Sequence, residues 1–201
     1  MVTLKAERVP IECVVRGYLS GSAWTEYKES GTISGMSAPK GLQESQELAQ
    51  PLFTPTTKAQ TGNDEPLNKE ELEGLVGKTT ARELEKKSLA VYRYGRDYAR
   101  GRGVIIADTK FEFGFADGKL ILIDEILTPD SSRFWDAARY TVGRSQPSFD
   151  KQPLRDWLVN SGWNKEPPAP MLPPEVIEAT TRLYREAYHR LTERTLQNVP
   201  S

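Results

Sequence analysis

The stretch VIIADTKFEFGFADGKLILIDEILT, residues 104–128, decides the fold of this chain. Two runs rich in β-branched and aromatic residues flank an Asp-Gly corner, which is the strongest short-range indication of a β-hairpin. Successive side chains of a strand point to opposite faces, so Asp108, Lys110 and Glu112 share one face while two phenylalanines take the other. The pattern therefore predicts a hairpin with one apolar face and one charged face.

The length of the turn decides which face Asp124 joins. A two-residue loop at Asp117-Gly118 would leave Asp124 on the phenylalanine face and bury a bare carboxylate. A three-residue loop, residues 116–118, with its glycine in a left-handed bulge would set Asp124 diagonal to Glu112 on the charged face. We prefer the three-residue register because it leaves both carboxylates in the open.

As diagonal neighbours on one face, the carboxylates of Glu112 and Asp124 would repel each other unless a cation lay between them. Hard carboxylate oxygens with few other protein ligands suit a Mg²⁺ ion that is shared with substrate phosphates. We therefore predict that these two residues bind Mg²⁺. The hairpin alone leaves an alternative open, which is a solvated sheet face with alternating charges.

Composition limits the class of protein. With 201 residues, 37% hydrophobic content and 27% charge, the chain can bury a core as one large domain or two small ones. A formal net charge of -1 gives no general attraction to nucleic acid or to an anionic membrane, so phosphate recognition must come from local cations. The single Cys13 and the single His189 exclude an internal disulfide and a metal site built from thiolates or imidazoles. No long apolar run or leader appears, and we expect a cytoplasmic protein.

The segment before the hairpin combines an apolar strand with a candidate phosphate loop. Residues 9–15, VPIECVV, indicate a buried strand, and residues 16–24 place Arg16 beside glycines and hydroxyls that include Ser22. Arginine offers a bidentate fork and glycine lets backbone N–H groups approach an anion, although an ordinary Gly/Ser turn is the alternative. The polar stretch 24–50 predicts loop with at most short strands.

Caps and helical periodicity indicate further helices. Asn68 caps a short acidic helical turn, a longer helix runs from Thr79 or Thr80 to about Arg100, and a final helix has Pro174 in its first turn. The expected inward stripe of the long helix is Leu84, Ser88, Val91, Gly95 and Tyr98.

Arg133 lies on the turn that follows the hairpin, and it therefore adjoins the carboxylate strand. That position favours contact with an anionic substrate, whereas the alternative is a surface ion pair with Asp130 or Asp136. The segment SFDKQ, residues 148–152, carries an Asp/Lys pair and an amide that suit both ends of an amino acid, or it is a rim loop.

Several longer motifs follow one another in order. They are IECVVRGYLSGS at 11–22, PLFTPTTKA at 51–59, DTKFEFG at 108–114, TPDSSRFW at 128–135 and SFDKQ at 148–152. This series resembles the SAICAR synthetase family, the phosphoribosylaminoimidazole-succinocarboxamide synthases of purine biosynthesis. The resemblance extends from about Leu4 to Leu196, and several long motifs in order are more specific than any single one.

The resemblance implies an α+β fold in which an antiparallel β-hairpin core packs with helices. We interpret residues 1–201 as a single domain, the C-terminal ATP- and substrate-binding portion of a two-lobed enzyme. We expect the family's N-terminal lobe, which carries a Gly/Lys segment over the ATP phosphates, to be absent from this chain. A second departure is Asn63, which stands where the family usually has a His-Asp pair, although Asp64 remains.

The chemistry that the resemblance implies is ATP-dependent ligation. L-Aspartate would be joined to the carboxylate of the imidazole ribonucleotide CAIR, giving SAICAR, ADP and phosphate. A carboxylate resists attack by amines, so ATP must first convert it into an acyl phosphate, and cations stabilise the charge that develops. The expected partners are therefore small-molecule substrates, not nucleic acid or membrane, and the oligomeric state stays open.

The nucleotide site follows from the same resemblance. Glu112 and Asp124 resemble the Mg²⁺ ligands, and Lys110 and Glu112 would lie near the ATP ribose and phosphates. The backbone that would face adenine is that of Lys5, Ala6, Glu7 and Arg8. The expected catalytic group is Lys110, Glu112, Asp124 and Arg133.

The substrate site is assigned in the same way. Arg16, Ser22 and Arg133 resemble the groups that hold the imidazole ribonucleotide and its phosphate. Further substrate-site candidates are Asp64, Asp108, Asp130 and Lys151. The rival interpretation is a non-catalytic remnant, or a subunit that keeps these motifs and needs a separate N-terminal lobe.

Overall fold

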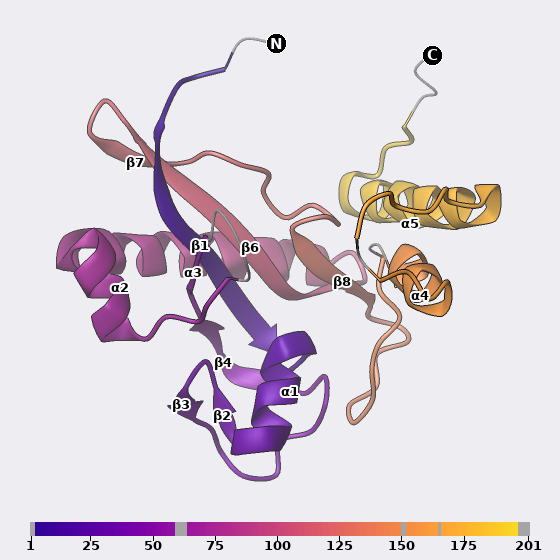
Figure 1. The fold of residues 1–201 in the computed structure, drawn as a ribbon, viewed down its shortest axis with the longest axis horizontal. Coiled ribbons are helices and arrows are strands. Elements are labelled where there is room, and N and C mark those ends of the chain that lie inside the picture. Colours follow the sequence, from indigo (N-terminus) through magenta and orange to yellow (C-terminus); the bar gives the residue numbers. More distant parts are fainter. Residues whose placement is uncertain (1–2, 59–63, 150–151, 165, 197–201) are drawn as a thin grey trace.

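The computed structural model describes residues 3–58, 64–149, 152–164 and 166–196. The elements are β1 (Glu7–Tyr18), α1 (Gly21–Ser30), β2 (Thr32–Ile33), β3 (Met36–Ser37), β4 (Glu47–Phe53), β5 (Thr56–Thr57), α2 (Lys69–Val76), α3 (Lys78–Arg100), β6 (Val104–Ala116), β7 (Lys119–Leu122), β8 (Ser132–Asp136), α4 (Gln152–Asn160) and α5 (Pro174–Thr192). Strands in the order β4-β1-β6-β7 form a curled antiparallel sheet, with β5 paired to β1 and β8 paired to β6 (Figure 1). The expected α+β fold with an antiparallel hairpin is confirmed.

The core lies between the sheet and α3, which crosses one face of it (Figure 1). Alternate residues of β1, from Val9 to Val15, point into this core and confirm the predicted buried strand. Cys13 is among them and is fully buried, and burial raises the pKa of its thiol to about 12. The other side of β1 and β6 stays open, and the charged residues gather there.

The hairpin turn has two residues, so the predicted three-residue register is wrong. Ala116 pairs with Lys119, and Asp117 and Gly118 between them have φ angles of 49° and 71°. Two successive left-handed residues match the twist of the flanking strands, which favours this tight turn. The burial that we expected for Asp124 does not occur, because β7 ends at Leu122 and the chain bends at the exposed Asp124.

The stretch 24–50, predicted as loop with at most short strands, has the short strands β2 and β3, but it also includes most of helix α1 and the start of the edge strand β4. Glycine and serine are poor helix formers, so α1 depends on tertiary contacts. Ala23 packs with Leu19 and Ile33, and Gly31 ends the helix in a left-handed conformation. Arg16 correspondingly lies in strand β1 and not in a loop.

The predicted helices are present. Asn68 and Glu71 form a reciprocal capping box at the start of α2, and α5 begins at Pro174 as expected. In α3 the inward stripe contains the buried Tyr92, whereas Tyr98 is 42% exposed, which corrects that part of the prediction. In the described part of the chain no helix is long and apolar enough to cross a membrane.

Candidate active site

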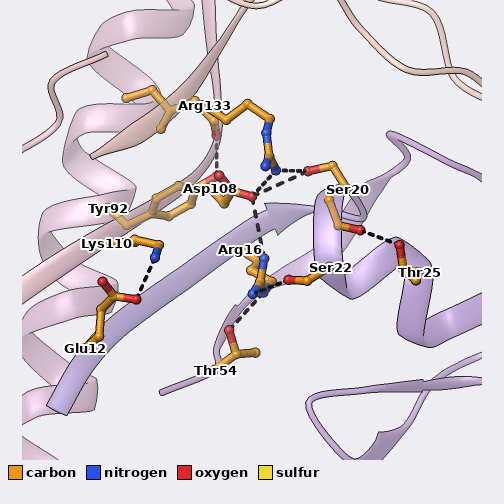
Figure 2. A network of polar contacts seen from close by, with 12 residues as sticks. Glu12, Arg16, Ser20, Ser22, Thr25, Thr54, Tyr92, Asp108, Lys110 and Arg133 are labelled. Carbon is orange, nitrogen blue, oxygen red and sulfur yellow. Dashed lines mark hydrogen bonds and ion pairs between the residues drawn. The ribbon is translucent and has the colours of Figure 1, made fainter. Parts of the chain in front are cut away.

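Three charged residues from neighbouring strands meet on the open face of the sheet. Arg16 of β1 stands directly opposite Asp108 of β6, and its Nη1 lies 3.6 Å from Asp108 Oδ2. Arg133 of β8 donates through Nη1 to the same carboxylate oxygen and to Ser20 Oγ, the latter at 2.9 Å (Figure 2). One carboxylate therefore holds two guanidinium groups side by side.

Hydroxyl groups and a glycine complete the setting of the two arginines. Arg16 donates through Nε to Thr54 Oγ1 at 3.0 Å and through Nη2 to Ser22 Oγ at 3.3 Å. Gly21 has a φ of +57°, and a Cβ there would lie 2.8 Å from Arg133 Nη2, so glycine permits this approach. Burial lowers the pKa of Arg16, and Asp108 opposes that change.

This arginine cluster (Arg16, Asp108 and Arg133) borders a cavity of about 250 Å³. The lining residues are Glu12, Val14, Arg16, Ser22, Thr56, Asp64, Asp108, Lys110, Asp130, Ser131, Ser132, Arg133 and Arg155. All predicted substrate-site residues within the described ranges line this cavity, while Lys151 lies outside those ranges. Paired guanidinium groups with nearby hydroxyls suit a phosphate or a carboxylate.

A second cavity of about 300 Å³ adjoins the first. It is lined by Glu12, Lys58, Lys110, Glu112, Asp124, Glu125, Asp130 and Ser131. Four of these residues border both cavities: Glu12, Lys110, Asp130 and Ser131. Ligands in the two cavities would therefore share a wall, with the Lys110 ammonium group between them.

Like charges face each other at the boundary of the second cavity. Glu12 and Glu112 are directly opposite in the β1–β6 ladder, a pairing that is unfavourable without a cation. Lys58 supplies it, because its Nζ lies 2.6 Å from Glu112 and 3.5 Å from Glu12. Lys110 Nζ donates to the buried Glu12 at 2.7 Å. The hydrogen bond to Glu112 raises the pKa of Lys58.

The predicted metal ligands Glu112 and Asp124 border one cavity, although the bend after β7 brings them there and not the strand register. Within the ranges the structure describes, no group of three or more His, Cys, Asp or Glu side chains could hold a metal ion. Two carboxylates nevertheless fit Mg²⁺, which keeps several waters and shares its remaining positions with substrate phosphates. The donor set fits a phosphate-shared ion better than an ion bound by protein alone.

The segment predicted to face adenine lies at the other end of the hairpin. Glu7 pairs with Phe115 and Arg8 with Gly114, and this segment lines neither of the two cavities. A Cβ on Gly114 would lie 2.8 Å from the Glu7 carbonyl oxygen, so the backbones approach closely here. The Lys5–Arg8 assignment stays a prediction.

Sequence reasoning missed Glu12, Lys58 and Arg155. Glu12 could have been found because it is a charged residue within the apolar run 9–15, and a buried charge needs a partner. Lys58 contacts Glu12 because β5 pairs with β1, and no local sequence pattern indicates that pairing. Arg155 of α4 lines the 250 Å³ cavity together with Arg133, which requires a tertiary contact between α4 and the sheet.

Comparison with known proteins decides the family. The SAICAR synthetase family model matches residues 1–170. The chain belongs to the SAICAR synthetase family. Similar proteins named phosphoribosylaminoimidazole-succinocarboxamide synthase include one from Maridesulfovibrio salexigens, 53% identical over 96% of this chain and 64% of its own length. Another, from Neisseria meningitidis, is 50% identical over 96% of this chain and 68% of its own length.

Solved structures of the family have the same fold. SAICAR synthase from Saccharomyces cerevisiae complexed with SAICAR has a TM-score of 0.87 and 44% identity, covering 96% of this chain and 64% of that one. A SAICAR synthetase in complex with ADP has a TM-score of 0.70 and 26% identity, covering 96% and 67%. The chain thus spans 64% of the length of the Maridesulfovibrio relative and of the yeast structure.

Proposed function

We propose that this chain provides the substrate-binding part of an ATP-dependent ligase that joins L-aspartate to the carboxylate of CAIR, giving SAICAR, ADP and phosphate. The observation that carries the proposal is the arginine cluster beside the cavity of Lys110 and Glu112. The names of the relatives and the SAICAR and ADP complexes of family members support it. We place the reaction in the cytoplasm.

In this mechanism the arginine cluster holds the ribonucleotide. Arg16 and Arg133 offer several N–H donors toward one anion, and Ser22 adds a hydroxyl, so these three residues would fix the phosphate of CAIR in the 250 Å³ cavity. Fixing that end orients the carboxylate that must react. Asp64, Asp130 and Lys151 are the candidates for further substrate contacts.

The second cavity would receive the nucleotide phosphates. Lys110 stands between the two cavities, where its positive charge would stabilise a phosphoryl group passing from ATP to the CAIR carboxylate. Glu112 and Asp124 would hold Mg²⁺, which when bound neutralises charge on the phosphates. The amine of L-aspartate would then attack the acyl phosphate and release phosphate, forming the amide. Lys5, Ala6, Glu7 and Arg8 would contribute backbone to the adenine site.

The length of the match favours a second candidate, a binding portion that needs the rest of a family enzyme for turnover. Phosphoryl transfer depends on holding the reactants and excluding water, so a partly closed site loses much of its rate. We expect little phosphate release by the 201-residue chain alone and restored release after fusion to the part of the Maridesulfovibrio relative that the match does not cover.

The test measures phosphate release with ATP, L-aspartate and CAIR. In the active form, Arg16→Ala should raise the Michaelis constant for CAIR, with little change in that for ATP. The exposed Asp97→Asn is the control and should leave both constants unchanged. Full turnover by the chain alone would contradict the binding-portion candidate, and no turnover in either form would contradict the ligase.

A further inference from the structure

Strand β6 contains a bulge just before Asp108. Ile106 pairs with Phe134 of β8, and Asp108 pairs with Arg133, the next residue along β8. Between these two pairs β6 advances by two residues while β8 advances by one. The extra residue is Ala107. A β-bulge bends its strand and changes the direction of the side chains that follow.

The bulge decides which face of the sheet receives the charged residues. Before it, Val104 and Ile106 lie in the core against α3, and after it Phe111 and Phe113 lie in the same core. In a regular strand, with side chains alternating, Asp108 would follow Ile106 into that core. Because of the bulge, Asp108 and the charged residues beyond it face the cavities instead.

Tyr92 of α3 bonds to the backbone at this bulge. Tyr92 is fully buried, and its hydroxyl donates to the Ile106 carbonyl oxygen at 2.7 Å, next to Asp108 (Figure 2). Gly17 of β1 leaves the room for it, because a Cβ there would lie 1.8 Å from Tyr92 Oη. The glycine and the hydroxyl thus fit each other beneath the arginine cluster.

We propose that Tyr92 is a positioning residue: its hydroxyl holds the bulge at Ile106, and the bulge directs Asp108 to the guanidinium groups of Arg16 and Arg133. Tyr92 lies on the core side of the sheet and lines neither cavity, so it acts through Asp108 and not on a ligand. The identity of the ligand that benefits rests on the proposed function.

The test is Tyr92→Phe, which removes the hydroxyl and keeps the ring. Calorimetry should show about tenfold weaker binding of SAICAR, because the carbonyl loses its donor and the cluster loosens. The affinity for ADP should stay unchanged, since the second cavity lies beyond the cluster. A crystal structure of the variant should show a changed bulge and a longer distance between Asp108 and Arg133.

Two control variants separate positioning from general stability. Tyr94→Phe removes a hydroxyl from the same helix at a side chain that is 77% exposed, and should change neither affinity. Leu84→Val loosens the same helix in the core without removing a hydrogen bond, and should lower stability while leaving SAICAR affinity intact.

The outcomes separate this inference from the proposed function. If Tyr92→Phe keeps the bulge and the Asp108–Arg133 contact, or if Leu84→Val weakens SAICAR binding equally, the positioning role is wrong. If the wild-type chain binds no SAICAR while the bulge still changes in the variant, the proposed function is wrong and the positioning of Asp108 stands.

Discussion

Replacing Asp108 by asparagine should reveal how the arginine cluster balances its charge. Two guanidinium groups and one carboxylate give the cluster a formal charge of about +1 at neutral pH, and the substitution raises it to about +2. The amide keeps the size of the side chain but cannot accept charge-assisted hydrogen bonds of the same strength. The perturbation therefore changes electrostatics much more than packing.

The magnitude follows from burial. The side chains of Arg16, Asp108 and Arg133 are 14%, 13% and 27% exposed, so all three are largely withdrawn from water. Removing one partner of a fully buried ion pair costs about 3–5 kcal/mol, and partial exposure of Arg133 lowers that figure. We expect Asp108→Asn to reduce the free energy of unfolding by about 2–3 kcal/mol.

Inorganic phosphate should restore part of this stability. A ligand that binds only the folded state raises the free energy of unfolding in proportion to the logarithm of its concentration over its Kd. Because the variant cluster carries more positive charge, we expect phosphate to stabilise Asp108→Asn more than the wild type.

The assay is urea unfolding at pH 7 with increasing phosphate, at constant ionic strength. The matched control is Asp97→Asn, at an exposed ion pair with Arg96, which should leave the free energy of unfolding nearly unchanged and gain nothing extra from phosphate. A loss below about 1 kcal/mol for Asp108→Asn, or an equal gain from phosphate in both proteins, would refute the charge-balance argument.

Three further variants test other charged contacts, the first two by urea unfolding across pH and the third by urea unfolding at pH 7 and hydrogen exchange. Lys58→Gln should lower the free energy of unfolding by about 1 kcal/mol at pH 7. Because Glu112 raises the Lys58 pKa, the wild type should keep this extra stability below pH 10.5 and lose it as pH rises through the folded-state pKa. Glu26→Gln should lower the free energy of unfolding by about 1–2 kcal/mol at pH 7. Burial raises the Glu26 pKa, but hydrogen bonds from two backbone N–H groups and a threonine hydroxyl lower it by more. The wild type should therefore be more stable than the variant above pH 4.5, and this difference should disappear as pH falls through the lowered folded-state pKa. Asp136→Asn should cost about 1 kcal/mol and speed hydrogen exchange in α5, because Arg190 bonds both oxygens of Asp136 at 3.2 and 3.3 Å; unchanged exchange would show that α5 is held by its apolar contacts alone.

The parts of the fold that sequence predicts best are those decided by local pattern. The alternation along residues 104–128 predicts the hairpin, and the caps at Asn68 and Pro174 predict helix starts, because these effects act within a few residues. The predicted turn length is wrong because the twist of the strands favours the two-residue turn, and the bend after β7 keeps Asp124 out of the core without a longer loop. Helix α1 was missed because its stability comes from packing around Ala23 and not from propensity.

Part of the candidate site could also be predicted from local sequence and part could not. Arg16, Asp108 and Arg133 lie in or beside motifs that indicate phosphate or metal binding, and the structure brings these three residues together. The pairing of Glu12 with Lys58 depends on the registers of three strands. Such long-range registers are set by the complete sheet, so no short window of sequence contains them.

The buried Cys13 gives the folded chain a practical property. It is the single cysteine of the sequence, it is fully buried on the core side of β1, and burial raises its thiol pKa to about 12. The thiolate is the form that reacts with alkylating reagents, so the Cys13 thiol does not react with them until the sheet opens. A cysteine introduced at the exposed position of Tyr94 would therefore take a fluorescent label alone, and slow labelling of Cys13 would report how often the whole core opens.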